Sequence, residues 1–286
     1  NMTKKLKDLL VRTVSALVFV LLIVGALWWS KWSAGVLFAV VLLGSLIEFY
    51  RLCRKTGAEP MYSVGIATSV AIFAVAFAIF KQWGTPVTDT TSRIVLGALL
   101  YAMLIVPTAF VCELWRKSPT PIANIATTFM GIIYVAVPMS MLLFVPQLLV
   151  GKWSALAMLA FMAIIWLNDV FAYLVGVTLG KHRLCERISP KKSWEGFVGG
   201  LVGAVGSAVL FGHILGGDLL IWGGLGLVTA LAGVAGDLVE SLIKREADVK
   251  DSGAMMPGHG GFLDRFDALL IATPFAVFYL IVTSLS

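Results

Sequence analysis

One short stretch of the sequence, residues 244–267, places charged side chains among glycines. Its charged and glycine residues include Lys244, Arg245, Lys250, Asp251, Gly253, Gly258, His259, Gly260, Gly261, Asp264, Arg265 and Asp267. Glycines let backbone N–H groups approach phosphate oxygens, while Asp264 and Asp267 are suitable ligands for a hard cation such as Mg²⁺ that shares phosphate oxygens. His259 suits a phosphate ligand, a proton donor or a side chain that packs the loop. This combination indicates phosphate chemistry.

A second polar group, residues 237–245, overlaps the start of this stretch. Asp237, Glu240, Ser241, Lys244 and Arg245 recur at intervals of three and four residues, which predicts one face of a helix. Two interpretations are open. The face belongs to a functional site, or it is an internal stripe of salt bridges in which the basic side chains reach the membrane surface and neutralise the acids.

Two further candidates lie earlier in the chain. Asp169 shares a predicted helix face with Tyr173 and Gly176, so its carboxylate should point into a helix bundle, as a functional group or a structural hydrogen-bond partner. The run Ser189-Pro190-Lys191-Lys192-Ser193 sets two lysines among hydroxyls, which suits a phosphate. An ordinary basic loop on the inner side of a membrane would have the same composition.

The rest of the chain is strongly apolar, and this determines which elements can position these groups. Of 286 residues 59% are hydrophobic and 13% charged, and the mean hydropathy is +0.93, whereas soluble domains carry about a quarter charged residues. A soluble globular enzyme is excluded. We expect an all-α, polytopic membrane protein with about nine helices, since lipid-exposed backbone must satisfy its own hydrogen bonds. The predicted spans are residues 14–29, 33–50, 62–80, 94–115, 125–150, 155–180, 196–215, 219–243 and 268–285.

The distribution of lysine and arginine over the loops predicts the orientation. With nine spans, all but four of the 22 basic residues fall on one side, the exceptions being Lys31, Lys81, Arg93 and Lys152. By the positive-inside rule the N-terminus is cytoplasmic and the C-terminus outside, in the inner (plasma) membrane, with the polar loops facing the cytoplasm. The net charge of +6 is explained by topology and attraction to anionic membrane lipids, and we expect no nucleic-acid partner.

Acidic residues divide the chain into two unlike halves. Eleven of the 16 lie between Asp169 and Asp267, so residues 151–286 are expected to carry the catalytic site. Residues 1–150 are expected to be a scaffold that could also offer a lipid-binding or dimer surface. In that half Glu48 and Glu113 each have an arginine one turn away, Arg51 and Arg116, and are interpreted as structural ion pairs.

Small residues also predict close helix packing in the second half. Residues 196–206 contain two overlapping Gly-x-x-x-Gly spacings, which permit close helix contact. Packing within the chain is the preferred interpretation, and a homodimer is the alternative.

If Asp169, Asp237, Asp264 and Asp267 share one site, they form an acidic, metal-binding pocket at the inner membrane surface. Its basic rim would be Lys191, Lys192, Lys244, Arg245, Lys250 and Arg265. Such a pocket suits joining a lipid phosphate to a soluble nucleotide. A secondary transporter of an anionic or phosphorylated solute is an alternative, although no internal repeat is found. Another lipid-phosphate transferase is a further alternative.

The polar stretches resemble a known family. Ser241-x-Ile243-Lys244-Arg245, then Lys250-Asp251, then Pro257-Gly258-His259-Gly260-Gly261-x-x-Asp264-Arg265-x-Asp267 is similar to the signature of the phosphatidate cytidylyltransferase (CDP-diglyceride synthase) family. The Ser189–Ser193 loop and the helix from Asn168 to Tyr173 also resemble that family, so the resemblance covers roughly residues 169–267. Met256 stands where the family usually has Leu, Ile or Phe.

This resemblance implies an Mg²⁺-dependent enzyme that converts CTP and phosphatidic acid into CDP-diacylglycerol and pyrophosphate. Asp237 and Asp264 are the expected metal ligands, and Asp169, Asp251 and Asp267 are further ligands or groups that hold the basic side chains. His259 would assist the departing pyrophosphate. The expected phosphate-binding residues are Ser189, Lys191, Lys192, Ser241, Lys244, Arg245, Gly260 and Gly261, with Lys250 and Arg265 also contacting phosphate.

Overall fold

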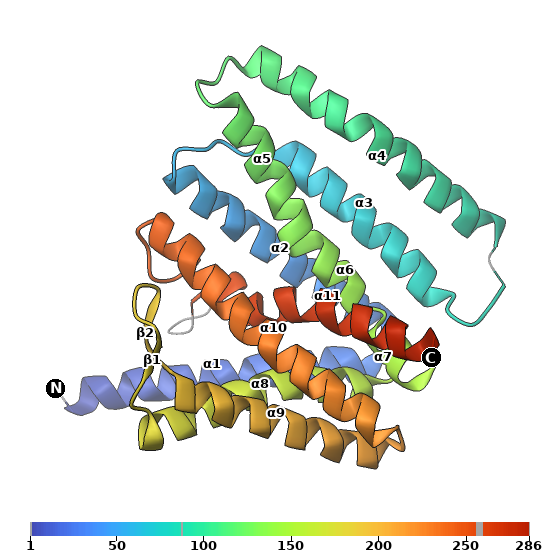
Figure 1. Ribbon diagram of the computed structural model, residues 1–286. Coiled ribbons are helices and arrows are strands. Elements are labelled where there is room, and N and C mark those ends of the chain that lie inside the picture. Colours follow the sequence, from blue (N-terminus) through green and yellow to red (C-terminus); the bar gives the residue numbers. More distant parts are fainter. Residues whose placement is uncertain (1, 87, 256–259, 286) are drawn as a thin grey trace. The chain divides into compact units, whose positions relative to one another are not determined.

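The computed structural model describes residues 2–86, 88–255 and 260–285, with side chains from residue 13 onward. Within these ranges eight helical segments are long and apolar enough to cross a membrane (Figure 1). This confirms an all-α polytopic membrane protein. The side of the membrane on which each terminus lies stays a prediction. The eight segments are Lys31–Lys55, Tyr62–Lys81, Asp89–Arg116, Pro121–Val150, Ala155–Leu179, Trp194–Leu215, Leu219–Glu246 and Leu263–Leu285.

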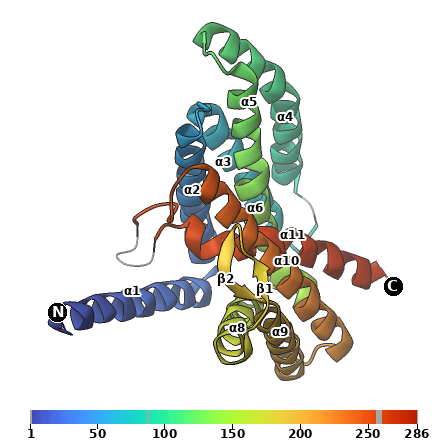
Figure 2. The ribbon, with the colours of Figure 1, turned by 60° about the vertical axis from the view of Figure 1, so that its left-hand side comes forward.

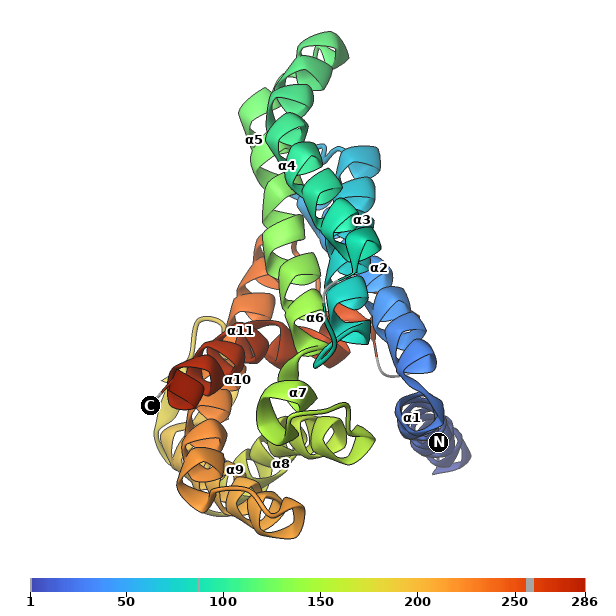
Figure 3. The ribbon, with the colours of Figure 1, turned by 90° about the vertical axis from the view of Figure 1, so that its right-hand side faces the viewer.

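The first of the nine predicted spans, residues 14–29, falls in α1 (Met2–Trp29). The part of α1 whose side chains are described, Thr13–Trp29, is apolar but shorter than the eight segments above. Ser30 lies between α1 and α2 (Lys31–Lys55) and forms a capping box at the start of α2. Its hydroxyl accepts from Ser33 N at 3.1 Å, while Ser33 Oγ accepts from Ser30 N at 3.0 Å. The chain turns sharply at this point, so α1 runs at a steep angle to α2 (Figures 2 and 3).

The chain forms two compact units, and the first comprises Asn1–Leu143 and Glu246–Arg265. After α1, its helices α2, α3 (Tyr62–Lys81), α4 (Asp89–Arg116) and α5 (Pro121–Gly131) pack side by side (Figures 1 and 3). The segment between Glu246 and Arg265, which holds most of the polar stretch, thus packs with helices from the start of the chain. The functional division at residue 150 stays a prediction.

Tyr50 lies at the centre of this helix packing. Its side chain is fully buried, its hydroxyl donates to Thr128 O at 2.8 Å, and its ring packs directly against Gly65 and Gly131. In contrast, α4 exposes large apolar side chains, including Met103 at 73%. Such an apolar outer surface suits lipid contact.

The predicted fifth span, residues 125–150, is not one continuous α-helix. After α5 come a π-helical turn η1 (Ile132–Ala136), α6 (Val137–Leu142) and α7 (Val145–Val150). Pro138 has no N–H to donate to the preceding turn, and its ring crowds that turn. The widened π turn lies directly before this proline, where the helical hydrogen-bond ladder is interrupted.

The second unit comprises Phe144–Arg245 and Phe266–Ser286. A short antiparallel hairpin of β1 and β2 connects α8 to α9 and lies at one end of these helices (Figure 2). The elements after α7 are α8 (Ala155–Leu179), β1 (Arg183–Cys185), β2 (Ser189–Ser193), α9 (Trp194–Leu215), α10 (Leu219–Glu246) and α11 (Leu263–Leu285), whose first residues belong to the first unit.

Glycines on α9 form the contact with α8. A side chain at Gly199 would overlap Val175, and one at Gly203 would overlap Phe171. Packing of these glycines within the chain is therefore confirmed, and the close approach holds the hairpin beside α8. A homodimer stays a prediction.

Candidate active site

A cavity of about 640 Å³ opens in the second unit, lined by α8, the hairpin, α9 and α10. Its size is typical of small-molecule sites. The lining also contains apolar side chains such as Val177 and Phe197, so the cavity combines charged groups with an apolar wall. It brings together five of the residues that the sequence singled out: Asp169, Ser189, Lys191, Lys192 and Asp237.

The hairpin that carries the two lysines is fastened at its base. The Glu195 carboxylate accepts hydrogen bonds from the backbone N–H groups of Lys181 at 3.1 Å and His182 at 3.2 Å, and lies 2.6 Å from His182 Nδ1. Ser193 Oγ accepts from Gly196 N at 3.1 Å and so caps α9. These contacts fix the direction in which the chain passes from β2 into α9, and they keep the side chains of β2 at the cavity.

Lys192 and Asp237 form an ion pair at this cavity. Their side chains are 27% and 33% exposed, so both remain accessible to a ligand. The lysine neutralises the carboxylate, and an entering phosphate and cation could exchange with these two partners.

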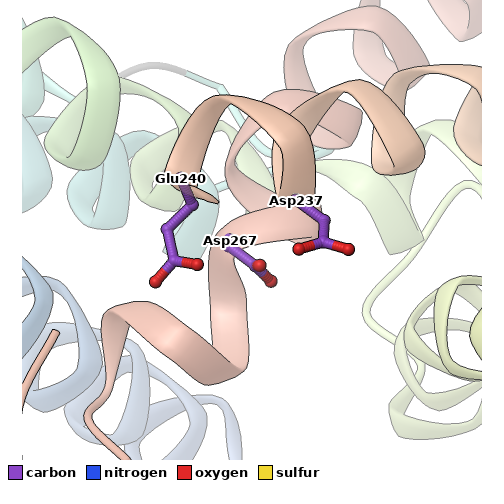
Figure 4. A group of neighbouring side chains, drawn as sticks. All are labelled: Asp237, Glu240 and Asp267. Carbon is purple, nitrogen blue, oxygen red and sulfur yellow. The ribbon is translucent and has the colours of Figure 1, made fainter. Parts of the chain in front are cut away.

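Three carboxylates gather where α10 and α11 meet. The ligand oxygens of Asp237, Glu240 and Asp267 lie within 4.8 Å of one another, and Figure 4 shows the three side chains directed to a common space. Gly236 permits this approach, because a side chain there would overlap Asp267 O. Three like charges at this separation repel one another, so the cluster requires cationic partners.

Lysines supply part of that positive charge. Lys244 Nζ lies 2.5 Å from a carboxylate oxygen of the buried Glu240, one helical turn away. Ser241 Oγ lies 3.5 Å from Asp237 Oδ1. Carboxylate oxygens are the ligands that hard divalent cations prefer, so the residues present fit Mg²⁺. Because lysine side chains are long and flexible, the ammonium groups of Lys192 and Lys244 could move from these carboxylates to phosphate oxygens when a cation binds.

In the first unit, Asp264 organises the segment that precedes it. Its Oδ2 accepts from Ser252 N at 2.9 Å and Gly261 N at 2.7 Å, and Ser252 Oγ lies 2.9 Å away. Gly260 beside it has φ +80°, a backbone conformation that favours glycine. The observed contacts give Asp264 a role in holding the loop, and its predicted role as a metal ligand stays a prediction.

The predicted ion pair of Glu48 with Arg51 is wrong. Glu48 instead accepts hydrogen bonds from Ser252 Oγ at 3.0 Å and from the backbone of the glycine-rich segment, and no ion pair joins it to Arg51 among the residues described. The second predicted pair is confirmed, since Arg116 Nη1 lies 2.9 Å from Glu113 Oε2. The polar contacts of Glu48 are thus with the segment from Ser252 to Leu263, and not with the nearby arginine.

The predicted site residues are divided between the two units, and their individual roles stay predictions. In the first unit Lys250, Asp251 and Arg265 are exposed. His259 lies outside the described residues. Those in the second unit are Asp169, Ser189, Lys191, Lys192, Asp237, Ser241, Lys244, Arg245 and Asp267; those in the first are Lys250, Asp251, Gly260, Gly261, Asp264 and Arg265.

The structure brings forward two carboxylates to which the sequence assigned no role in the site. Glu240 was a functional candidate on the polar helix face with Asp237, whereas Glu48 was interpreted as a structural ion pair. Glu240 carried a signal, its spacing of three residues from Asp237, but that spacing also fitted a salt-bridge stripe. Only the approach of α11 shows that Glu240 belongs to a three-carboxylate cluster. Glu48 carried no such signal, because its partners lie more than 200 residues away in the chain.

Comparison with known proteins supports an assignment at the family level. The chain is 45% identical over 122 residues to the phosphatidate cytidylyltransferase of Haemophilus influenzae and 48% identical over 120 residues to that of Bacillus subtilis. These alignments cover 41% of this chain and only 42% and 44% of the two relatives, less than half of their length. The phosphatidate cytidylyltransferase of a Synechocystis species is 29% identical over 302 residues, covering 94% of this chain and 96% of that protein.

A sequence profile of the cytidylyltransferase family matches residues 10–283, which include nearly all of both units. The match takes in the cavity, the acidic cluster and the glycine-rich segment together. The protein therefore belongs to the cytidylyltransferase family.

Proposed function

We propose that this protein is a phosphatidate cytidylyltransferase that transfers the CMP group of CTP to phosphatidic acid, producing CDP-diacylglycerol and pyrophosphate. The observation that carries the proposal is the cavity of the second unit, where Asp169 and Asp237 lie with Lys191 and Lys192 in a member of this family. A nucleoside triphosphate and a lipid phosphate both need cationic side chains to bind their negative charge, and the apolar helices provide access for a lipid.

The cavity has one surface suited to phosphate groups and another suited to the hydrocarbon part of a lipid. Lys191, Lys192 and Ser189 on β2 would bind phosphate oxygens, because ammonium and hydroxyl groups donate hydrogen bonds to them. Val177 and Phe197 give the same cavity an apolar wall suited to a hydrocarbon substituent. A lipid phosphate can thus approach from apolar surroundings while the nucleotide approaches from water.

Asp237, Glu240 and Asp267 would hold Mg²⁺, since their oxygens form a compact carboxylate group. When bound, the ion would neutralise part of the triphosphate charge and orient its oxygens. Asp169, in the lining of the neighbouring cavity, would hold basic side chains in place.

The reaction is a substitution at the α-phosphorus of CTP. A phosphate oxygen of phosphatidic acid forms the new bond, the bond to the oxygen that bridges the α- and β-phosphates breaks, and pyrophosphate leaves with that electron pair. Lys191, Lys192 and Lys244 would stabilise the charge that develops on the phosphate oxygens. Holding both substrates in the cavity would supply much of the rate enhancement.

We place the active site on the cytoplasmic side of the inner (plasma) membrane, with the N-terminus on the same side. This orientation is supported by the concentration of lysine and arginine in alternate loops, and CTP is available in the cytoplasm.

The test is conversion of labelled CTP into a lipid-soluble product by the purified protein with phosphatidic acid and Mg²⁺. Controls omit the lipid, add a chelator, replace CTP by ATP, or use Asp237→Asn. We expect product only with CTP, lipid and metal together, and none above background with the variant. Folded wild-type protein that forms no product would overturn the proposal, and uptake of a phosphorylated solute into proteoliposomes would then favour a transporter.

A further inference from the structure

Glu48 is a buried carboxylate of α2 that contacts the glycine-rich segment at several points. It is 5% exposed, and its oxygens accept from Phe262 N at 3.1 Å and Leu263 N at 2.9 Å. Ser252 Oγ lies 3.0 Å from the same carboxylate. All these residues belong to the first unit. One side chain of the second helix therefore holds both ends of the loop.

The negative charge of Glu48 is matched to the start of α11. Leu263 is the first residue of that helix, and the first N–H groups of a helix have no partner within it. They carry the positive end of the helix dipole, which stabilises a nearby carboxylate. Glu48 thus serves as a cap supplied from α2.

The loop is shaped to receive this side chain. A side chain at Gly253 or Gly261 would overlap the Glu48 carboxylate, and one at Gly44 would overlap the ring of Phe262. Gly44 and Glu48 are four residues apart and share one face of α2. The loop backbone and one aromatic ring therefore pack closely against that face.

Glu48 is linked through Ser252 to Asp264, a predicted site residue. Ser252 Oγ lies 3.0 Å from Glu48 Oε2 and 2.9 Å from Asp264 Oδ2, and its single proton can be donated to only one of them at a time. Asp264 in turn accepts from Ser252 N and Gly261 N. Loss of the Glu48 carboxylate would free the loop and the backbone that orients Asp264.

We propose that Glu48 is a positioning residue for the cytidylyltransferase reaction, which fixes the described parts of the 250–265 segment and the first turn of α11. It contacts no substrate and acts through Ser252, the Phe262 and Leu263 amides, and Asp264. The inference rests on the proposed function for its kinetic test, while its structural test is independent of activity.

The test compares Glu48→Gln with Glu113→Gln. Glu113 is the matched control because it is an equally buried carboxylate of the first unit, 3% exposed, whose contacts are with Arg116 and Asn124. The measurements are kcat and KM for CTP at several Mg²⁺ concentrations. Amide hydrogen exchange of peptides within residues 249–255 and 260–270 is measured alongside.

We expect Glu48→Gln to lower kcat/KM for CTP by about 10- to 100-fold and to raise exchange in those peptides. Glu113→Gln should lower thermal stability but change kcat/KM by less than about twofold. Glu48→Asp, which keeps the charge with a shorter reach, should recover part of the activity. Equal kinetics for the two Gln variants, or increased exchange spread evenly over the chain, would overturn the proposal.

If Glu48→Gln does not fold, Glu48→Asp and Ser252→Ala carry the test, since each weakens only part of the network. Raised exchange limited to the loop, with lower kcat/KM, supports the anchor; wild-type values in both contradict it. If wild-type protein does not use CTP and phosphatidic acid, the proposed function fails. Exchange alone then decides whether Glu48 holds the loop.

Discussion

The two units use carboxylates in different ways. In the second unit, Asp237, Glu240 and Asp267 face one another, and their ion-pair partners include lysines at the ends of long side chains. In the first unit, Glu48 and Asp264 accept hydrogen bonds from backbone N–H groups of one loop. Lysine partners can exchange with an incoming cation or phosphate, whereas backbone donors cannot leave without unfolding the loop. The same functional group is therefore suited to ligand binding in one unit and to loop order in the other.

The largest effect is expected for Asp237→Asn. Removing one carboxylate from the cluster should weaken metal binding and lower kcat by more than about 100-fold at saturating Mg²⁺. The loop of the first unit should keep its wild-type amide exchange, because Asp237 makes none of the loop contacts described. Near-normal turnover would show that the cluster holds no essential cation.

Asp264→Asn should also remove most activity while leaving a folded, membrane-inserted protein. Unlike Asp237→Asn, it should raise amide exchange at residues 260–263, because an amide replaces the charged acceptor of Ser252 and Gly261. Activity and exchange measured on the same preparation distinguish the two variants. A loss of activity with unchanged exchange would favour a direct role as metal ligand over one in loop order.

A smaller effect on stability is expected for Gly261→Ala. The added methyl group would overlap the Glu48 carboxylate, and such overpacking costs about 1–3 kcal/mol. Gly206→Ala on α9 is the matched control, because nothing lies within 4 Å of the added atom there. Thermal unfolding in detergent should show a lower Tm for the first variant only. Equal Tm values would mean that the loop adapts without loss.

The smallest effects are expected on the side of the membrane predicted to be outside. Lys31→Ala and Lys81→Ala should each change activity by less than about twofold, since neither lysine lines the cavity or belongs to the acidic cluster. Lys81 Nζ lies 4.9 Å from the centroid of the Trp32 ring, so Lys81→Ala is also expected to lower stability slightly. The lipid-product assay checks both. A large loss of activity in either would contradict the predicted topology.

Much of the fold was predictable because lipid restricts the choices. Apolar runs long enough to cross a bilayer predicted the helices. Eight of the nine predicted spans lie in described helical segments that are long and apolar enough to cross a membrane. The glycines of α9 predicted packing within the chain, which Gly199 and Gly203 confirm against α8. The interruption at η1 was not predicted, since Pro138 lies in a run, Pro121–Val150, whose mean hydropathy of 2.1 is within the range of the unbroken helices.

Residue types and spacing alone determined the class of chemistry: carboxylates, lysines and glycines concentrated in short stretches of an apolar chain. They also made Asp237 a candidate, because charge in an apolar segment is costly without a partner, and Lys191 and Lys192 candidates, because two lysines among hydroxyls suit a phosphate. Only the tertiary structure decided which carboxylates meet. Glu240 joins Asp237 and Asp267 because α11 packs on α10 at Gly236, and Glu48 serves a loop more than 200 residues away because α2 packs beside it. Local periodicity specifies a face of a helix, whereas the partner of that face is set by packing between distant segments.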